Sequence, residues 1–261
     1  LILRRFDRVS AISSAMYAHA VEKGIAEAKL VLLPNWVATD EIFPLPGPSA
    51  MREALCLRPD TVVALYAGNM SEKQGLDTLV EAARRLAGDD RVGFVFAGEG
   101  AARARLEAMC AGLANVRFLP LQPAERLNEL LNLADIHLLP QRAGVARLVM
   151  PSKLLGMTAS GRPVIAGADP ESALGKVAPC CGILVAPEDG RAMAVAVAAL
   201  VDDAPRRARL GAAGRRYAVE NWSRDVVLGR FLATVNALRR ARTSGAGAAP
   251  VPLAGSSDGA D

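Results

Sequence analysis

Two lysines are the residues of this sequence best suited to hold a phosphate group. Lys73 lies in the glycine-bearing segment GNMSEKQG at 68–75, and Lys153 lies in MPSKLLGM at 150–157. Gly68 permits close approach of the backbone to a ligand, and a lysine ammonium binds phosphate as a compact point charge. An exposed lysine in a plain strand-to-helix turn is the alternative interpretation of the first segment.

The segment that contains Lys153 has the composition of a helix start. Pro151 suits the first helical position, and the Ser152 hydroxyl can accept hydrogen bonds from free backbone N–H groups. Lys153 adds positive charge where the helix dipole already favours an anion. The segment therefore predicts the start of a helix that faces an anion.

A third glycine-bearing loop, Gly-Glu-Gly at 98–100, begins like a dinucleotide-binding fingerprint. Arg103 stands where the third glycine is expected, and no acidic residue follows about 20 residues later. A nicotinamide site is therefore disfavoured. The sequence contains no Asp-x-Asp pair to bridge a metal to a diphosphate, and His137 within DIHLLP is expected to be a packed strand residue. We expect no metal and no cofactor.

The elements that must position these loops alternate between short apolar runs and longer helical patterns. This order predicts an α/β fold, a Rossmann-like doubly wound parallel sheet, with ligands bound beyond the carboxyl ends of the strands. The predicted strands are 62–68, 92–98, 116–119, 135–140, 163–167 and 182–185, and the predicted helices are 73–87, 101–112, 124–133, 151–160 and 188–201.

Domain boundaries follow from changes in this pattern. The first residue is Leu1, and residues 1–40 contain strand and helix patterns outside the alternation, so we interpret them as the remnant of a preceding domain. The predicted organisation continues with a Pro/Gly-bearing linker at 41–60, the nucleotide-binding domain at 61–214, a C-terminal cross-over helix at 215–242 and a disordered tail at 243–261.

Composition limits the class of protein. The chain of 261 residues is 51% hydrophobic, and no apolar run reaches the roughly 18 to 20 residues needed to cross a bilayer. The four cysteines are Cys56, Cys110, Cys180 and Cys181. Their spacing is not typical of zinc sites, and we expect them to be free thiols in a reducing cytoplasm.

The net charge of +4 is distributed unevenly. The stretch from Arg206 to Arg242 holds ten arginines against Glu220 and Asp225, a net charge of +8. An anionic membrane surface is one partner for such a stretch, and a pair of solvated amphipathic helices is the simpler interpretation. Nucleic acid is disfavoured as a partner because few aromatic residues lie among the arginines.

These motifs together resemble glycosyltransferase family 4, which has the GT-B fold of two Rossmann-like domains. The resemblance covers residues 1 to about 240, and GNMSEKQGL, LNLADIHLLPQRA and LVMPSKLLGM are especially similar to the branch of colanic acid and O-antigen biosynthesis. That branch includes fucosyl- and N-acetylfucosaminyl-transferases. The resemblance identifies this chain as the C-terminal portion, with residues 1–40 matching the end of the acceptor domain.

The resemblance also implies site residues. Lys73 would contact the donor diphosphate and is the catalytic candidate, and the helix that starts near Lys153 would hold the phosphate or sugar. The other implied donor-binding residues are Gly68, Asn69, Glu99, Leu121, Pro151, Ser152 and Leu154. The sequence departs from the family pattern at Asn69, where an arginine is common, and at Leu148 and Gly156, where two glutamates are common.

The implied function is transfer of a sugar from a GDP- or UDP-linked donor to a lipid-linked saccharide, without a metal. The location implied is the cytoplasm, at the surface of the inner membrane. Two alternatives remain: a family 4 transferase of another glycan pathway, and a non-catalytic module that binds nucleotide sugars or a partner. Because acceptor positioning needs the other domain, we expect this chain alone to be inactive in transfer.

Overall fold

The computed structural model describes residues 2–144 and 150–244. Its centre is a six-stranded sheet in the order β5-β4-β3-β6-β7-β8, in which all neighbouring strands are parallel. The strands are β3 (Val62–Ala67), β4 (Val92–Ala97), β5 (Val116–Leu119), β6 (Ile136–Pro140), β7 (Val164–Gly167) and β8 (Gly182–Val185). All six predicted strands are confirmed.

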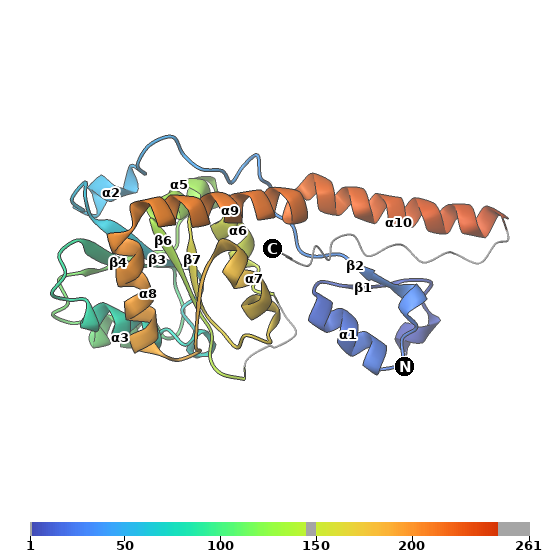
Figure 1. The fold of residues 1–261 in the computed structure, drawn as a ribbon, viewed down its shortest axis with the longest axis horizontal. Coiled ribbons are helices and arrows are strands. Elements are labelled where there is room, and N and C mark those ends of the chain that lie inside the picture. Colours follow the sequence, from blue (N-terminus) through green and yellow to red (C-terminus); the bar gives the residue numbers. More distant parts are fainter. Residues whose placement is uncertain (1, 145–149, 245–261) are drawn as a thin grey trace.

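Helices cover both faces of this sheet, as a doubly wound fold requires (Figure 1). Alternate residues of β3 point to opposite faces, because Tyr66 packs in one hydrophobic core and Leu65 in another. One face packs against α3 (Asp77–Arg85), α4 (Arg103–Met109) and α8 (Gly190–Asp202), and the other against α2 (Met51–Ala54), α5 (Leu127–Leu133), α6 (Lys153–Ala159) and α7 (Ala173–Cys181).

The chain order places a topological switch point between β3 and β6. The chain leaves β3 toward β4 and β5, and then returns to add β6, β7 and β8 on the other side. Neighbouring crossovers therefore diverge at the carboxyl ends of β3 and β6, which leaves a crevice for a ligand. The loops that contain Gly68 and Lys153 follow these two strands.

The first residues form a small separate layer. A two-stranded parallel sheet of β1 (Val9–Ala11) and β2 (Leu30–Leu32) packs with α1 (Ser14–Glu22), and two 3-10 helices, η1 (Ile2–Arg5) and η2 (Glu27–Lys29), flank it. This unit lies beside the main sheet, below α10 in Figure 1. The predicted linker at 41–60 is not structureless, since it contains α2.

Two long helices end the described chain. α9 (Ala204–Trp222) packs on α6 and α7, and α10 (Arg224–Ser244) extends past the main sheet toward the β1–β2 unit (Figure 1). The sequence boundary at 214/215 falls inside α9, and the helical break lies at Ser223 instead. The predicted tail at 243–261 begins within α10, and its residues from 245 onward lie outside the described residues.

Candidate functional site

The loops that follow β3 and β4 lie against each other at the carboxyl edge of the sheet. The Gly68 N–H donates to the Ala97 carbonyl at 2.8 Å, and the Met70 N–H donates to the Glu99 carbonyl at 2.8 Å. Gly68 and Gly98 have φ angles of 140° and 136°. A Cβ atom on Gly98 would lie 2.1 Å from the Gly68 oxygen, so this close approach requires glycine.

The Lys153 side chain reaches from the start of α6 to the loop after β3. Its Nζ donates to the Tyr66 hydroxyl at 2.7 Å and to Gln74 Oε1 at 3.4 Å. The ammonium also lies 4.5 Å from the centroid of the Tyr66 ring, within cation–π distance. A Cβ atom on Gly68 would lie 2.5 Å from Lys153 Cε, so glycine leaves the space that the lysine occupies.

Burial changes the ionisation of this pair. Partial removal from water lowers the pKa of Lys153 to about 8, and burial raises the pKa of the Tyr66 hydroxyl. Tyr66 therefore keeps its proton, which it donates to the Asn69 carbonyl at 2.6 Å. Lys153 is a partly desolvated cation at neutral pH, and an anion beside it would be attracted more strongly than in water.

A cavity of about 370 Å³ opens beside Gly68 and Lys153. Its walls come from the segment between β2 and α2, from the loops after β3, β4 and β5, and from α5 and α6, and they are mostly apolar. The lining residues beyond Gly68 and Lys153 are Trp36, Val37, Ile42, Ala67, Ala97, Gly98, Leu121, Gln122, Leu127, Leu130, Leu131, Ser152, Leu155, Gly156 and Met157. Apolar walls with few polar groups are typical of small-molecule sites.

Several predicted site residues meet at this cavity. Gly68, Leu121, Ser152 and Lys153 line it, and Leu121 is 71% exposed. The Ser152 hydroxyl does not cap α6, contrary to expectation. Its backbone is already helical, with φ −59° and ψ −27°, whereas a capping serine has extended angles that turn the hydroxyl toward the free N–H groups.

Leu154, predicted to bind the donor, does not line the cavity. It is fully buried and packs in the hydrophobic core beneath α6 together with Leu131 and Met157. Helical geometry explains the difference, because successive residues point about 100° apart around the helix axis. Leu155 and Gly156 line the cavity in its place.

The remaining predicted residues lie outside the cavity wall. Glu99 forms an ion pair with Arg103 at 2.8 Å. Arg103 also donates to the Gly98 carbonyl at 2.7 Å and the Leu119 carbonyl at 3.0 Å, so the arginine in the third glycine position joins the ends of β4 and β5. Asn69 contributes its carbonyl to Tyr66, and Pro151 is half-buried before α6.

Lys73 lies in a short 3-10 helix, η3 (Glu72–Gln74), directly after the Gly68 loop. Its side chain is exposed and forms no hydrogen bond or ion pair with the residues that the structure describes. Its neighbour Gln74 accepts the hydrogen bond from Lys153. Lys73 does not line the cavity, and its contact with a donor stays a prediction.

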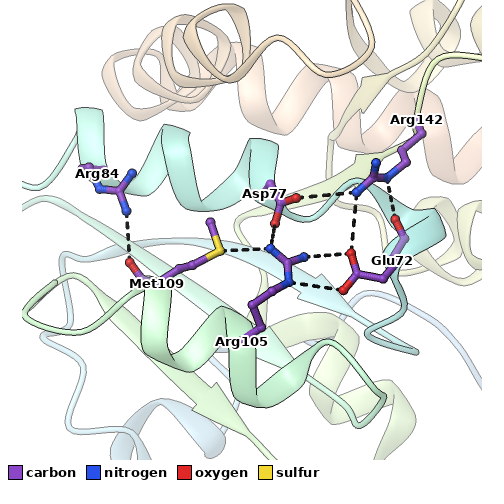
Figure 2. Close-up of polar contacts among 6 residues, drawn as sticks. All are labelled: Glu72, Asp77, Arg84, Arg105, Met109 and Arg142. Atoms are coloured by element: carbon purple, nitrogen blue, oxygen red, sulfur yellow. Dashed lines mark hydrogen bonds and ion pairs between the residues drawn. The ribbon is translucent and has the colours of Figure 1, made fainter.

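A polar network fixes η3 in place (Figure 2). Arg142, from the loop after β6, donates to the Glu72 carbonyl at 2.6 Å and lies 3.6 Å from the Asp77 carboxylate. Arg105 on α4 bonds both carboxylates, to Asp77 at 2.7 Å and to Glu72 at 3.0 Å. Figure 2 shows Glu72 between the two guanidinium groups, which restrains the segment that carries Lys73.

A second cavity, of about 210 Å³, lies between the β1–β2 unit and the main domain. Ser13, Asn35 and Leu32 line it from the N-terminal side, and Trp222 and Lys176 from the other. Leu155 lines both this cavity and the one beside Lys153, so the two are neighbours.

His137 is a packed strand residue, as predicted. It is fully buried, its Nε2 lies 3.1 Å from Ser160 Oγ, and burial lowers its pKa to about 3. Sequence reasoning missed Tyr66, Arg142 and Trp36, which contribute to the site or its support. The available signal for Trp36 was an aromatic residue just before the proline-bearing linker. Leu148 lies outside the described residues.

With this geometry established, the family of the chain is clear. The family model of Glycosyl transferases group 1 matches residues 61–203, and the chain belongs to this family. The matched span includes the loops of Gly68 and Gly98 and the helix of Lys153. The sheet also matches solved GT-B structures, so the chain has the Rossmann-like C-terminal fold of that class.

Two individual proteins show which members of the family this chain is similar to. The chain is 34% identical over 241 residues to WcaI of Escherichia coli, whose name describes a glycosyl transferase of colanic acid biosynthesis, with coverage of 88% of this chain and 57% of WcaI. It is 29% identical to WbjE of Pseudomonas aeruginosa, named as a glycosyltransferase, with coverage of 89% and 58%. The chain thus spans somewhat over half the length of these relatives.

A solved structure supports the fold. HepE of Anabaena, crystallised with UDP and glucose, superposes with a TM-score of 0.74 at 18% identity, with coverage of 90% of this chain and 64% of HepE. At this identity the likeness concerns the fold. Within the described residues, no helix has both the length and the apolar character needed to cross a membrane.

Proposed function

We propose that this chain is the donor-binding portion of a glycosyltransferase that moves a sugar from a nucleoside diphosphate to a lipid-linked saccharide in bacterial exopolysaccharide or O-antigen synthesis. The observation that carries the proposal is the position of Lys153 beside Gly68, at the mouth of the apolar cavity on the sheet's switch point. The likeness to WcaI supports the pathway, and the bound UDP and glucose of HepE support the ligand class.

In this proposal the diphosphate lies over the Gly68 loop between Lys153 and Lys73. Departure of the nucleoside diphosphate places negative charge on the leaving oxygen, and the two ammonium groups stabilise that charge where it develops. Tyr66 positions Lys153 by accepting its hydrogen bond. Transfer then needs neither a metal ion nor a covalent nucleophile on the protein.

The acceptor would approach through the cavity beside the β1–β2 unit, which adjoins the donor cavity at Leu155. A lipid-linked acceptor requires the enzyme to work at the cytoplasmic face of the inner membrane. The arginines of α9 and α10 would favour that anionic surface, since each basic residue near it contributes about 1 kcal/mol.

Calorimetry tests the donor class directly. GDP, UDP, dTDP and inorganic pyrophosphate are titrated into the wild-type protein and into Lys153→Met, which keeps the length of the side chain without its charge. We expect one nucleoside diphosphate to bind best, and Lys153→Met to bind it at least roughly ten-fold more weakly. If none of these nucleotides binds, the proposal is refuted.

Gly156 favours a second candidate, a non-catalytic module that binds nucleotide sugars. It lines the cavity where the family commonly has a glutamate, and it offers no carboxylate to a sugar or ribose hydroxyl. Such a module would bind the donor but never consume it. The two candidates separate when donor hydrolysis and transfer are measured in a protein extended to the full length of the relatives.

A further inference from the structure

Trp36 is the one aromatic side chain among the described residues that line the donor cavity. It lies in the segment between the β1–β2 unit and the main domain, and 47% of its surface is exposed. An exposed indole normally costs free energy by ordering water at its apolar surface, unless a ligand or partner covers it. The exposed surface of Trp36 borders a cavity.

The backbone around Trp36 is fixed. The Val37 N–H donates to the Trp222 carbonyl at 2.9 Å, and the Arg224 N–H donates to the Val37 carbonyl at 3.0 Å. Arg215 donates to the Thr39 carbonyl at 2.9 Å. Residues of α9 and α10 thus hold this segment through hydrogen bonds at Val37 and Thr39. A ligand that binds Trp36 therefore does not have to order this backbone.

The cavity offers few polar groups to recognise a nucleobase. Among the described residues that line it, the polar side chains are Gln122, Ser152 and Lys153. Lys153 already contacts Tyr66 and lies at the diphosphate end. Apart from Trp36, the rest of the wall is mostly leucine and other apolar surface, so a planar base must be held largely by apolar contact and stacking.

We propose that Trp36 is the main contact for the nucleobase of the donor, stacking its indole ring on the base while Leu121 contacts the opposite side. This inference rests on the proposed function, and it assigns the base to the Trp36 side of the cavity. Leu121, which is 71% exposed and lines the same cavity, supplies the second apolar surface. The Gln122 side chain, which also lines the cavity, would form hydrogen bonds with the edge of the base.

The test is calorimetric titration of wild type, Trp36→Ala, Trp36→Phe and Phe43→Ala. The ligands are the nucleoside diphosphate that binds best, ribose 5-phosphate and inorganic pyrophosphate. Phe43 is a matched control, because it lies in the same segment between β2 and α2 and is 39% exposed but does not line the cavity. Trp36→Ala should bind the nucleotide roughly ten-fold more weakly, with pyrophosphate unchanged. Trp36→Phe and Phe43→Ala should bind as wild type does.

Fluorescence gives a second readout. The sequence has two tryptophans, and Trp222 is only 5% exposed and lines the other cavity. The nucleotide should change the emission of wild type but not that of Trp36→Phe. Unchanged nucleotide affinity in Trp36→Ala overturns the inference and leaves the proposed function standing. An equal loss for ribose 5-phosphate or pyrophosphate also overturns it. Absence of nucleotide binding in wild type instead refutes the proposed function.

Discussion

Lys153 and Tyr66 are joined by a 2.7 Å hydrogen bond across the switch point of the sheet. The bond connects α6, which follows β6, to the end of β3, although the two residues are 87 positions apart. The Tyr66 hydroxyl in turn donates a hydrogen bond to the Asn69 carbonyl, which restrains the Gly68 loop. The cation and the glycine loop are therefore positioned together before a ligand arrives, which lowers the entropy cost of binding.

The lowered pKa of Lys153 predicts how binding depends on pH. Because the ammonium is charged below about pH 8, affinity for a nucleoside diphosphate should fall as the pH rises through that value. The second ionisation of the phosphate has a pKa of about 6 and is largely complete by about pH 7, so the lysine dominates the change above that pH. Calorimetry between about pH 7 and pH 9.5 measures it, and Lys153→Met should show a flat profile. An equal fall in that variant would assign the change to another group.

Stability of the free protein should have the opposite dependence on pH. The folded-state pKa of Lys153 is lowered from 10.5, so between about pH 8 and 10.5 the unfolded chain binds more protons than the folded one. The contribution of Lys153 to the free energy of unfolding therefore increases with pH across this window. The difference between wild type and Lys153→Met in urea denaturation isolates it.

Lys73→Ala should weaken binding of a nucleoside diphosphate far more than binding of the nucleoside, because Lys73 is assigned to phosphate. A hydrogen bond to a charged group contributes about 1.5 to 3 kcal/mol, which corresponds to a loss of roughly ten-fold or more. Lys23→Ala removes another exposed lysine, from the N-terminal unit, and should leave both affinities unchanged. Equal weakening of nucleoside and diphosphate would remove Lys73 from the phosphate site.

Arg142 should matter through the segment that it restrains. In Arg142→Ala, amide hydrogen exchange at residues 71–75 should accelerate, because the bond to the Glu72 carbonyl is lost. Exposed ion pairs contribute only about 0.2 to 1 kcal/mol, so global stability should change little while diphosphate affinity falls. Arg84→Ala, which loses only a bond to the Met109 carbonyl at the far side of Figure 2, is the control. Unchanged exchange at 71–75 would contradict a positioning role.

Much of the fold could be predicted from the local pattern of apolar residues. Buried parallel strands are continuous apolar runs, so all six strands of the main sheet were predictable. The helix α7 was not predicted, because it contains Gly175 and Pro179, residues that disfavour helix interiors. Neither residue prevents the helix here, since Leu174 and Ala178 pack in the core and tertiary contacts outweigh propensity.

The site was only partly predictable for a different reason. Lys73, Lys153 and the glycines occur in recognisable local segments. Tyr66 and Arg142 act on residues distant in sequence, through contacts that exist only once β3 and β6 are neighbours. No local pattern distinguishes Tyr66 from any other buried strand aromatic.

One side of α10 carries exposed apolar side chains. Leu228, Phe231, Leu232 and Val235 are 39% to 58% exposed along one side of the helix. We predict that this face packs against the acceptor domain, and its exposure in the described residues leaves it available for such a contact. A protein extended upstream to the length of the relatives should bury these side chains.

That extension should also decide activity: this chain should bind a sugar nucleotide yet transfer nothing to a lipid-linked acceptor. Transfer requires donor and acceptor in near-attack geometry, and such positioning can lower the barrier by about 7 to 11 kcal/mol. The β1–β2 unit supplies one side of a cavity of only about 210 Å³ beside the donor site. The assay follows a radiolabelled donor with membrane lipid extract, on this chain and on the extended protein. Comparable turnover by both would show that the small unit already binds the acceptor. Binding without turnover by either would favour the non-catalytic module and point to Gly156 as its cause.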